Sequence, residues 1–129
     1  MQATNTQDFY LAYIACLNAQ DWPRLGDFVE ADVRHNDRPL GLTGYRAMLE
    51  NDFARIPDLR YEVELLVADG NCVGSRLGFN CSPQGEFLGL PVNGRRVVFS
   101  ENVLYELRDG KIARVWSVID KSAIEAQLP

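Results

Sequence analysis

Residues that commonly bind metals are scarce in this sequence. It contains one histidine, His35, and three cysteines, Cys16, Cys72 and Cys81, which do not stand at the spacing of metal ligands. A zinc ion needs three or four such side chains, so a metal site is not expected. An odd number of cysteines also argues against a disulfide framework, and free thiols are typical of a reducing compartment. We therefore expect a cytoplasmic protein.

Leader-like, membrane-spanning and strongly basic segments are also missing. Residues 1–8 have neither a charged n-region nor an apolar h-region, and no apolar run is long enough to cross a bilayer. The formal net charge is −5, and only Arg95 and Arg96 form a basic pair. Because nucleic-acid phosphates favour clustered Lys and Arg, we expect neither a nucleic-acid partner nor a membrane partner.

What the sequence does contain is the composition of a globular domain. Its 129 residues are 47% hydrophobic and 24% charged. A chain of this length buries one sizeable core and is too short to divide comfortably into two domains. No internal repeat or linker interrupts it, so residues 1–129 are expected to form a single domain.

The first half of the chain carries the patterns of three helices. Thr4 stands at the capping-box spacing from Gln7, and an apolar stripe at helical spacing follows. Pro23 fits the first turn of a second, short helix. Thr43 can cap a third, which extends to Ile56 and is stopped by the proline after it. The first stripe consists of Phe9, Tyr10, Tyr13, Ile14 and Leu17.

The second half carries the patterns of strands. Apolar and charged residues alternate from Leu59 to Val67, and the Asp-Gly pair at residues 69–70 predicts a hairpin to a strand over residues 72–81. A short strand between turns, a long strand over residues 95–107 and a final strand follow. We therefore expect an α+β domain, with helices packed on one face of a mostly antiparallel sheet of about six strands.

The final strand ends an apolar alternation on a carboxylate. Strand side chains alternate between faces, so Trp116 and Asp120 point to the same side. A carboxylate beside a large aromatic ring in a partly dry pocket has a raised pKa, which makes Asp120 a candidate for proton transfer. Alternatively, Asp120 is the N-cap of the closing segment, Lys121 to Gln127. The strand pattern leaves both readings open.

Three other polar residues are candidates for a pocket. The only histidine, His35, stands at the end of a short strand. Arg76 shares a strand face with two glycines, so it is either a buried charge that needs a partner or part of a solvated face. Tyr13 belongs to the first helical stripe, where a core position is the simpler interpretation, but its hydroxyl could serve a pocket.

Several short pieces, taken in order, resemble one protein family. The chain is similar to SnoaL-like polyketide cyclases and predicted ester cyclases, within the cone-shaped fold shared with nuclear transport factor two and ketosteroid isomerase. The similarity covers nearly the whole chain. The matching pieces are Val-Arg-His-Asn at 33–36, Gly-Tyr at 44–45, Pro-Asp-Leu at 57–59, Gly-Glu-Phe-Leu-Gly-Leu-Pro at 85–91 with Gly94, and Asp-Gly-Lys-Ile at 109–112 followed by Trp116 and Asp120.

The resemblance implies a curved sheet whose concave face is covered by the three helices of the first half. It also implies proton transfer without a metal or organic cofactor, in which the carboxylate of an acidic residue removes a proton next to a carbonyl and an aldol step closes a ring. The substrate would be a small apolar carbonyl or ester compound. The catalytic residues implied are Asp120 and His35, and the substrate-binding residues are Asn36, Arg76, Trp116, Tyr13 and Phe53.

Further expectations concern assembly and alternative functions. Related cone domains commonly pair through the outer face of the sheet, and the strands here carry apolar residues on both faces, so a homodimer is expected. Fold alone does not establish catalysis. Isomerisation in place of ring closure, non-catalytic binding of a small ligand, and a structural dimer with an unused pocket are the alternatives.

Overall fold

The computed structural model describes the backbone of residues 3–129 and the side chains from Thr6 onward. Its helices are α1 (Ala3–Ala19), the 3₁₀ helix η1 (Trp22–Asp27), α2 (Gly41–Arg55) and α3 (Lys121–Ala126). Its strands are β1 (Val29–His35), β2 (Glu62–Asp69), β3 (Cys72–Cys81), β4 (Glu86–Phe87), β5 (Leu90–Pro91), β6 (Val97–Arg108) and β7 (Lys111–Ile119). None of the helices within this described part is long and apolar enough to cross a membrane.

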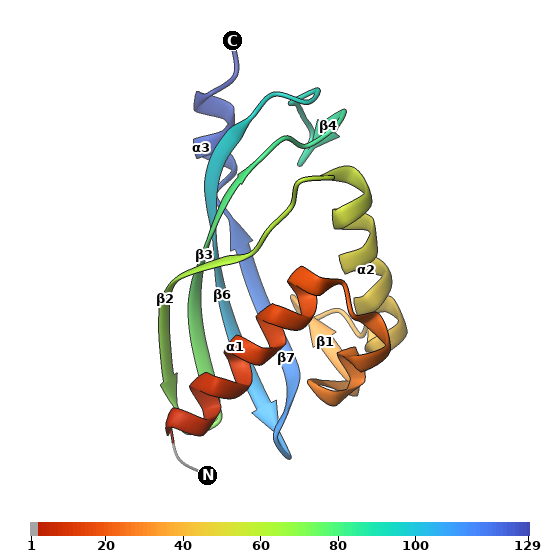
Figure 1. Cartoon of the computed structure of the whole chain (residues 1–129), viewed down its shortest axis with the longest axis vertical. Coiled ribbons are helices and arrows are strands. Elements are labelled where there is room, and N and C mark those ends of the chain that lie inside the picture. Colours follow the sequence, from red (N-terminus) through yellow and green to blue (C-terminus); the bar gives the residue numbers. More distant parts are fainter. Residues whose placement is uncertain (1–2) are drawn as a thin grey trace.

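Five strands form one curved sheet in the order β1-β7-β6-β3-β2 (Figure 1). All neighbours are antiparallel except β1, which runs parallel to β7. The short strands β4 and β5 pair only with each other, around a turn in which Leu88 and Gly89 have positive φ angles. The expected α+β class is thus confirmed, but the count of about six strands becomes five plus a separate two-stranded ribbon.

α1, η1 and α2 cover the concave face of the sheet, whereas α3 lies at one end of it, beside β6 (Figure 1). α1 crosses it so that the Tyr10 ring packs against Tyr105 of β6, with ring centroids 5.0 Å apart, and α2 packs against β1. The capping role predicted for Thr4 concerns a side chain outside the described ones. The second helix is a 3₁₀ helix, as suits a six-residue segment that contains Pro23 and Gly26.

Two predictions about caps have opposite outcomes. Thr43 lies inside the first turn of α2, because the helix begins at Gly41, and Leu40 stands at its N-cap without a side-chain bond. The predicted cap at Thr43 is therefore wrong. Asp120, by contrast, is the N-cap of α3, and its carboxylate accepts a hydrogen bond of 3.1 Å from the backbone N–H of Ala123. The capping alternative for Asp120 is confirmed.

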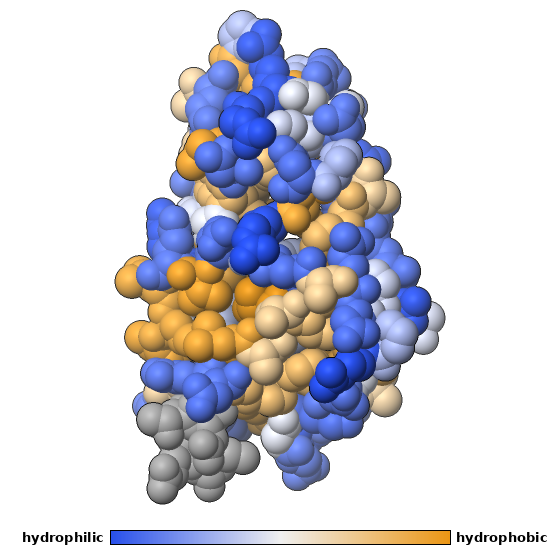
Figure 2. Space-filling model, viewed as in Figure 1, coloured by the Kyte–Doolittle hydropathy of each residue, from blue (hydrophilic) through white to orange (hydrophobic). Residues whose placement is uncertain are grey.

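The two faces of the sheet have different characters. On β6 the inward residues are Val97, Phe99, Glu101, Val103 and Tyr105, and on β7 they include Val115, Ser117 and Ile119. The outward face carries ion pairs together with exposed apolar side chains, namely Leu65, Val67, Val98, Leu104 and Val118. Figure 2 shows an apolar area at the lower left, over α1 and β2. The core lies between the inward face and the helices.

Candidate functional site

A cavity of about 210 Å³ lies between the concave face of the sheet and the helices. Its wall is mainly aliphatic and aromatic: Leu17, Met48, Leu49, Ile56, Leu59, Leu77, Phe79, Phe87, Phe99, Val103, Val115 and Ile119. Its polar members are His35, Asp52, Glu101, Ser117 and four tyrosines, Tyr13, Tyr45, Tyr61 and Tyr105. A dry cavity of about 150 Å³ holds benzene, so this space suits a compact molecule of one or two rings.

Two carboxylates face this apolar space. Glu101 comes from the middle of β6, and burial raises its pKa to about 7, with the negative charge of Asp52 adding to the effect and the nearby Ser117 hydroxyl opposing it. Asp52 comes from α2, where burial raises its pKa to about 6 although Arg55 opposes the shift. Near neutral pH each group therefore exchanges readily between its protonated and charged forms, which suits proton transfer.

His35 adds a third titratable group to the lining. It stands at the end of β1, and its ring centroid lies 6.2 Å from that of Tyr45. Burial lowers its pKa, and the positive charge of Arg38 lowers it further. The imidazole is therefore mostly neutral at pH 7, where it has one N–H to donate and one nitrogen to accept a hydrogen bond.

Buried tyrosines form two hydrogen-bonded pairs beside the carboxylates. The hydroxyls of Tyr13 and Tyr45 lie 2.6 Å apart, and those of Tyr10 and Tyr105 lie 3.1 Å apart. The rings of Tyr13 and Tyr105 meet edge to face at 6.0 Å, which joins the two pairs. These contacts fix the hydroxyl positions against α1, α2 and β6.

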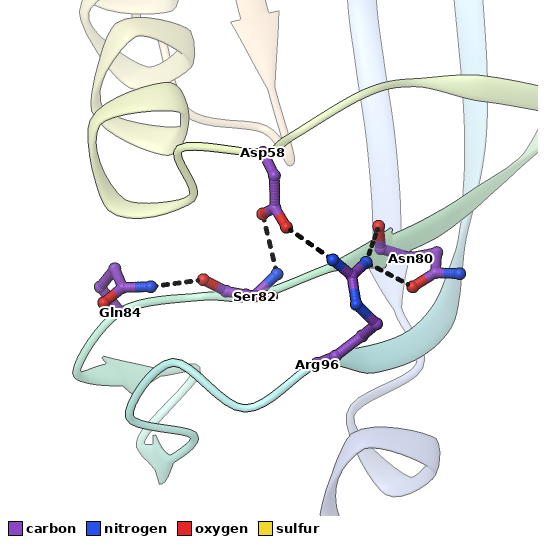
Figure 3. A network of polar contacts seen from close by, with 5 residues as sticks. All are labelled: Asp58, Asn80, Ser82, Gln84 and Arg96. Atoms are coloured by element: carbon purple, nitrogen blue, oxygen red, sulfur yellow. Dashed lines mark hydrogen bonds and ion pairs between the residues drawn. The ribbon is translucent and has the colours of Figure 1, made fainter.

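The segment that carries β4 and β5 completes the wall through Phe87, whose ring centroid lies 5.7 Å from that of Phe99. Polar contacts hold this segment to its surroundings (Figure 3). Asp58 accepts a 2.8 Å hydrogen bond from the backbone N–H of Ser82 and pairs with Arg96 at 3.5 Å. Arg55 of α2 donates to the backbone carbonyl of Glu86 at 2.9 Å. The segment is therefore attached to α2 and to the loop after it.

The structure places two of the predicted site residues, Tyr13 and His35, on the cavity wall. Phe53 lies one layer behind the wall, where its ring packs 5.8 Å from Trp22 and 6.0 Å from Tyr61. It supports Tyr61 and does not itself line the cavity. The expected wall position of Phe53 is thus corrected to a core position.

Asp120 and Trp116 do not face the cavity. They lie on the outer side of β7, where the Arg114 guanidinium stacks 4.6 Å from the centre of the Trp116 ring and Asp120 is exposed at the start of α3. The expected placement of both is wrong because the inward face of β7 is the alternate one, which carries Val115, Ser117 and Ile119. The predicted pairing of an acid with an aromatic wall is therefore not found on this strand.

Arg76 and Asn36 are also turned away from the cavity. Arg76 pairs with Glu64 at 3.2 Å on the outer face, and the Glu64 side chain occupies the space over Gly78. Of the two alternatives for Arg76, the position on a solvated face is therefore the correct one. Asn36 is exposed, and its side-chain amide accepts from the backbone N–H of Ser117 at 2.9 Å and donates to the backbone carbonyl of Ser117 at 3.3 Å. Asn36 thus continues the pairing of β1 with β7.

Glu101 and Asp52 are the site residues that the sequence analysis missed. Glu101 interrupts an otherwise apolar inward alternation on β6, flanked by Phe99 and Val103. Asp52 stands three residues after Leu49 on the buried face of α2, where a carboxylate is out of place. A single acid inside an apolar periodicity is the signal that identifies both.

Metal-ligand geometry is not found among residues 3–129: no group of three His, Cys, Asp or Glu side chains there is arranged to hold an ion. Cys16, Cys72 and Cys81 are unpaired thiols. The groups of the cavity wall that can exchange a proton are its carboxylates, imidazole, phenols and the Ser117 hydroxyl.

The chain is similar to several solved structures. A SnoaL-like polyketide cyclase from Agrobacterium tumefaciens strain C58 is 55% identical, with a TM-score of 0.96 and 100% coverage of both chains. TsrD from Streptomyces laurentii is 25% identical, with a TM-score of 0.85 over 98% of this chain and 96% of that one. IdmH from Streptomyces antibioticus is 22% identical, with a TM-score of 0.81 over 95% of this chain and 96% of that one.

The sequence itself was compared in two further ways. No curated protein sequence matches the chain. The family model of the SnoaL-like polyketide cyclases matches residues 7–128, nearly the whole chain. With the cone-shaped α+β fold and the 55% identical relative, this match confirms the resemblance found in the sequence: the chain belongs to the SnoaL-like polyketide cyclase family.

Proposed function

We propose that the protein catalyses cofactor-free proton transfer on a small apolar carbonyl compound held in the cavity, with Glu101 as the proton acceptor. The observation that carries this proposal is a carboxylate with a pKa raised to about 7 on the wall of a largely apolar cavity. A general base works best when its pKa lies near the working pH. The membership in a family of polyketide cyclases supports a carbonyl substrate.

The chemical step is the breaking of a C–H bond next to the carbonyl. The proton passes to the Glu101 carboxylate, and the electron pair moves onto the carbonyl oxygen to give an enolate. The enolate then either takes the proton back at another atom, which is isomerisation, or attacks a second carbonyl of the same molecule, which closes a ring and leaves an alkoxide that takes the proton back from Glu101. Family membership favours the ring closure, and both outcomes begin with the same proton transfer.

Asp52 and His35 support this step in different ways. The charge of Asp52 contributes to the raised pKa of Glu101 and so keeps Glu101 basic enough to accept a carbon-bound proton. His35 lies in the lining with a lowered pKa, so it contributes a neutral hydrogen-bonding group that orients the substrate. Neither role requires a cofactor.

The experiment follows enolisation directly. 2-Tetralone, a two-ring ketone, is incubated with the protein in D₂O, and replacement of its hydrogens next to the carbonyl by deuterium is measured by NMR. We expect the protein to accelerate the exchange and Glu101→Gln to reduce the acceleration by about a hundredfold or more. Glu106→Gln is the matched control, because Glu106 is on the same strand and pairs with Arg114 at 3.9 Å outside the cavity.

Two outcomes would count against the proposal. Equal exchange rates with the parent protein and Glu101→Gln would remove Glu101 from the reaction. Binding of 2-tetralone without any acceleration of exchange would instead support the non-catalytic ligand-binding alternative. Unchanged exchange in Glu106→Gln, together with loss in Glu101→Gln, is the result that supports proton transfer inside the cavity.

A further inference from the structure

The Tyr13–Tyr45 pair joins α1 to α2 on the wall of the cavity. Both residues are almost fully buried, with 1% and 3% of their surface exposed, and their hydroxyl oxygens lie 2.6 Å apart. Both also line the cavity. The pair is therefore a rigid polar element in an otherwise largely apolar enclosure.

The two phenols carry two protons, and the bond between them uses one. The second proton needs an acceptor, because a buried O–H group without a partner is costly. Among the residues whose side chains the structure describes, neither hydroxyl has another protein hydrogen-bond partner. The acceptor within reach is consequently an atom of whatever occupies the cavity.

We infer that Tyr45 donates a hydrogen bond to the carbonyl oxygen of the bound molecule, and that Tyr13 positions the Tyr45 hydroxyl by donating to it. This inference rests on the proposed function for the class of molecule, a ketone of one or two rings. In that setting Tyr45 holds the oxygen on which negative charge develops while Glu101 takes the proton. Preorganised donors of this kind stabilise such an oxygen strongly in a low-dielectric site.

The 2.6 Å distance between the two hydroxyls allows either phenol to be the donor, and the surroundings of the two phenols differ. Burial raises the pKa of both. The bond to Tyr45 raises the pKa of Tyr13 further, whereas the bond from Tyr13 lowers that of Tyr45. Tyr45 also lies beside the polar part of the cavity wall, with its ring centroid 6.2 Å from that of His35, so we assign the free proton to Tyr45 and the donation within the pair to Tyr13.

Tyr45 also lies in the same enclosed space as the carboxylates. The negative charges of Glu101 and Asp52 each raise its pKa, which places all three within electrostatic reach of one another. The Tyr10–Tyr105 pair has a different setting, because Tyr10 is not part of the cavity wall and has the Ser75 hydroxyl close to it. Tyr10 therefore provides a matched control with a hydroxyl pair of the same kind.

The test compares a ketone with the hydrocarbon of the same shape. Dissociation constants for 2-tetralone and for tetralin, which lacks the oxygen, are measured by NMR titration with the parent protein and with Tyr45→Phe. We expect Tyr45→Phe to weaken 2-tetralone binding about tenfold and to leave tetralin binding unchanged. Infrared spectra of the bound ketone provide a second readout, in which the C=O stretch moves to higher frequency in Tyr45→Phe because its hydrogen bond is lost.

Further variants separate Tyr45 from its neighbours. Tyr13→Phe leaves the Tyr45 proton in place, so its effect on ketone binding should be about two- to threefold. Tyr10→Phe should have no effect on ketone binding beyond a change in stability, which thermal unfolding measures. Tyr61, another tyrosine of the wall, is tested as Tyr61→Phe and should change ketone binding less than Tyr45→Phe.

Several results would overturn the assignment. An equal loss for 2-tetralone and tetralin in Tyr45→Phe would show a packing effect, and a greater ketone-specific loss in Tyr13→Phe or Tyr61→Phe would assign the donor elsewhere. Lack of 2-tetralone binding at millimolar concentration would also contradict it. Because binding does not need turnover, the same titration with Glu101→Gln keeps the two proposals apart: retained ketone selectivity there supports Tyr45 even if Glu101 proves not to be the base.

Discussion

The inward and outward faces of β6 and β7 hold acids in opposite environments. Inward, Glu101 faces an apolar cavity and its pKa is raised to about 7 by burial. Outward, Glu106 pairs with Arg114, and Asp120 caps α3 in contact with solvent. The same functional group, a carboxylate, is thus buried on the cavity side of the sheet and takes part in ion pairs and a helix cap on the other side. Environment, rather than position in the last strands, determines which acid is available for chemistry.

The largest expected effect separates the acids of the two faces. Asn is as good an N-cap as Asp, so Asp120→Asn removes a charge while keeping the start of α3 intact. We expect Asp120→Asn to retain ketone exchange within about twofold, against the hundredfold loss in Glu101→Gln. The measurement is deuterium exchange into 2-tetralone with both variants. A loss in Asp120→Asn comparable to that in Glu101→Gln would instead support Asp120, at the end of β7, as the proton acceptor.

The second prediction concerns what covers the outer face. We propose that it pairs with a second copy of the chain, because Leu104 and Val118 are 61% and 72% exposed there and apolar area of this kind favours association. Sedimentation velocity at micromolar concentration should show a dimer, and Leu104→Lys should make it monomeric. Leu11→Lys is the control, since Leu11 is 46% exposed on α1 and lies away from this face. A monomeric parent protein would contradict the proposal.

The third prediction concerns the cost of the inward charge. The folded protein holds the proton of Glu101 up to a pKa of about 7, whereas the unfolded chain releases it near the ordinary pKa of a glutamate, 4.5. The folded state therefore binds more protons between these values, and the free energy of unfolding falls as pH rises through this window. Glu101→Gln should remove that part of the fall, about 3 kcal/mol by pH 8. Urea unfolding at pH 4 and pH 8 measures it.

A related test uses the neighbouring acid. Asp52→Asn removes the charge that contributes to the raised pKa of Glu101. The pH at which ketone exchange reaches half of its maximum, expected near the Glu101 pKa, should then move to lower pH. A pH profile of the exchange rate from pH 5 to 9 measures the shift, and a shift to higher pH would contradict the electrostatic coupling.

The smallest effect is expected on the outer face. Arg76 and Glu64 form an exposed ion pair, with 45% and 50% of their side chains accessible. Exposed pairs contribute little, so Arg76→Ala should change the free energy of unfolding by no more than about 1 kcal/mol and leave ketone exchange unaltered. Chemical denaturation and the exchange assay measure the two quantities. A strong loss of exchange in Arg76→Ala would contradict this prediction and show that Arg76 affects the reaction in the cavity.

The positions of the main strands could be predicted from the sequence, but the face of the sheet to which their side chains point could not. Alternation on β7 is apolar on both sides, because Trp116 and Val118 face outward while Val115 and Ile119 face inward. Periodicity alone does not choose between two such faces. Arg114 is informative in retrospect, since a charged residue two positions before Trp116 marks the outer side, where its guanidinium covers the ring.

The two buried acids could be detected from the sequence, whereas the contacts between tyrosines could not. Glu101 and Asp52 each break an apolar period, which a count of inward positions on β6 and α2 reveals. The Tyr13–Tyr45 bond joins residues 32 positions apart on two helices, so it depends on how these helices pack. Tyr13 and His35 lie on the cavity wall, as predicted. Their neighbours there, Tyr45 and the two carboxylates, are brought close to them only by tertiary packing.

The contacts of Asp58 and Arg96 have a consequence for the range of molecules that this scaffold can accept. They attach the segment of β4 and β5 from its two ends, whereas Glu101, Asp52 and the tyrosine pair belong to β6, α1 and α2. The segment that closes one part of the cavity wall and the residues that carry its titratable groups therefore belong to different parts of the chain. A different side chain at position 87 would resize this part of the cavity without replacing Glu101 or Asp52. In terms of the proposed function, this segment would determine the size of the ketone accepted and not the proton transfer.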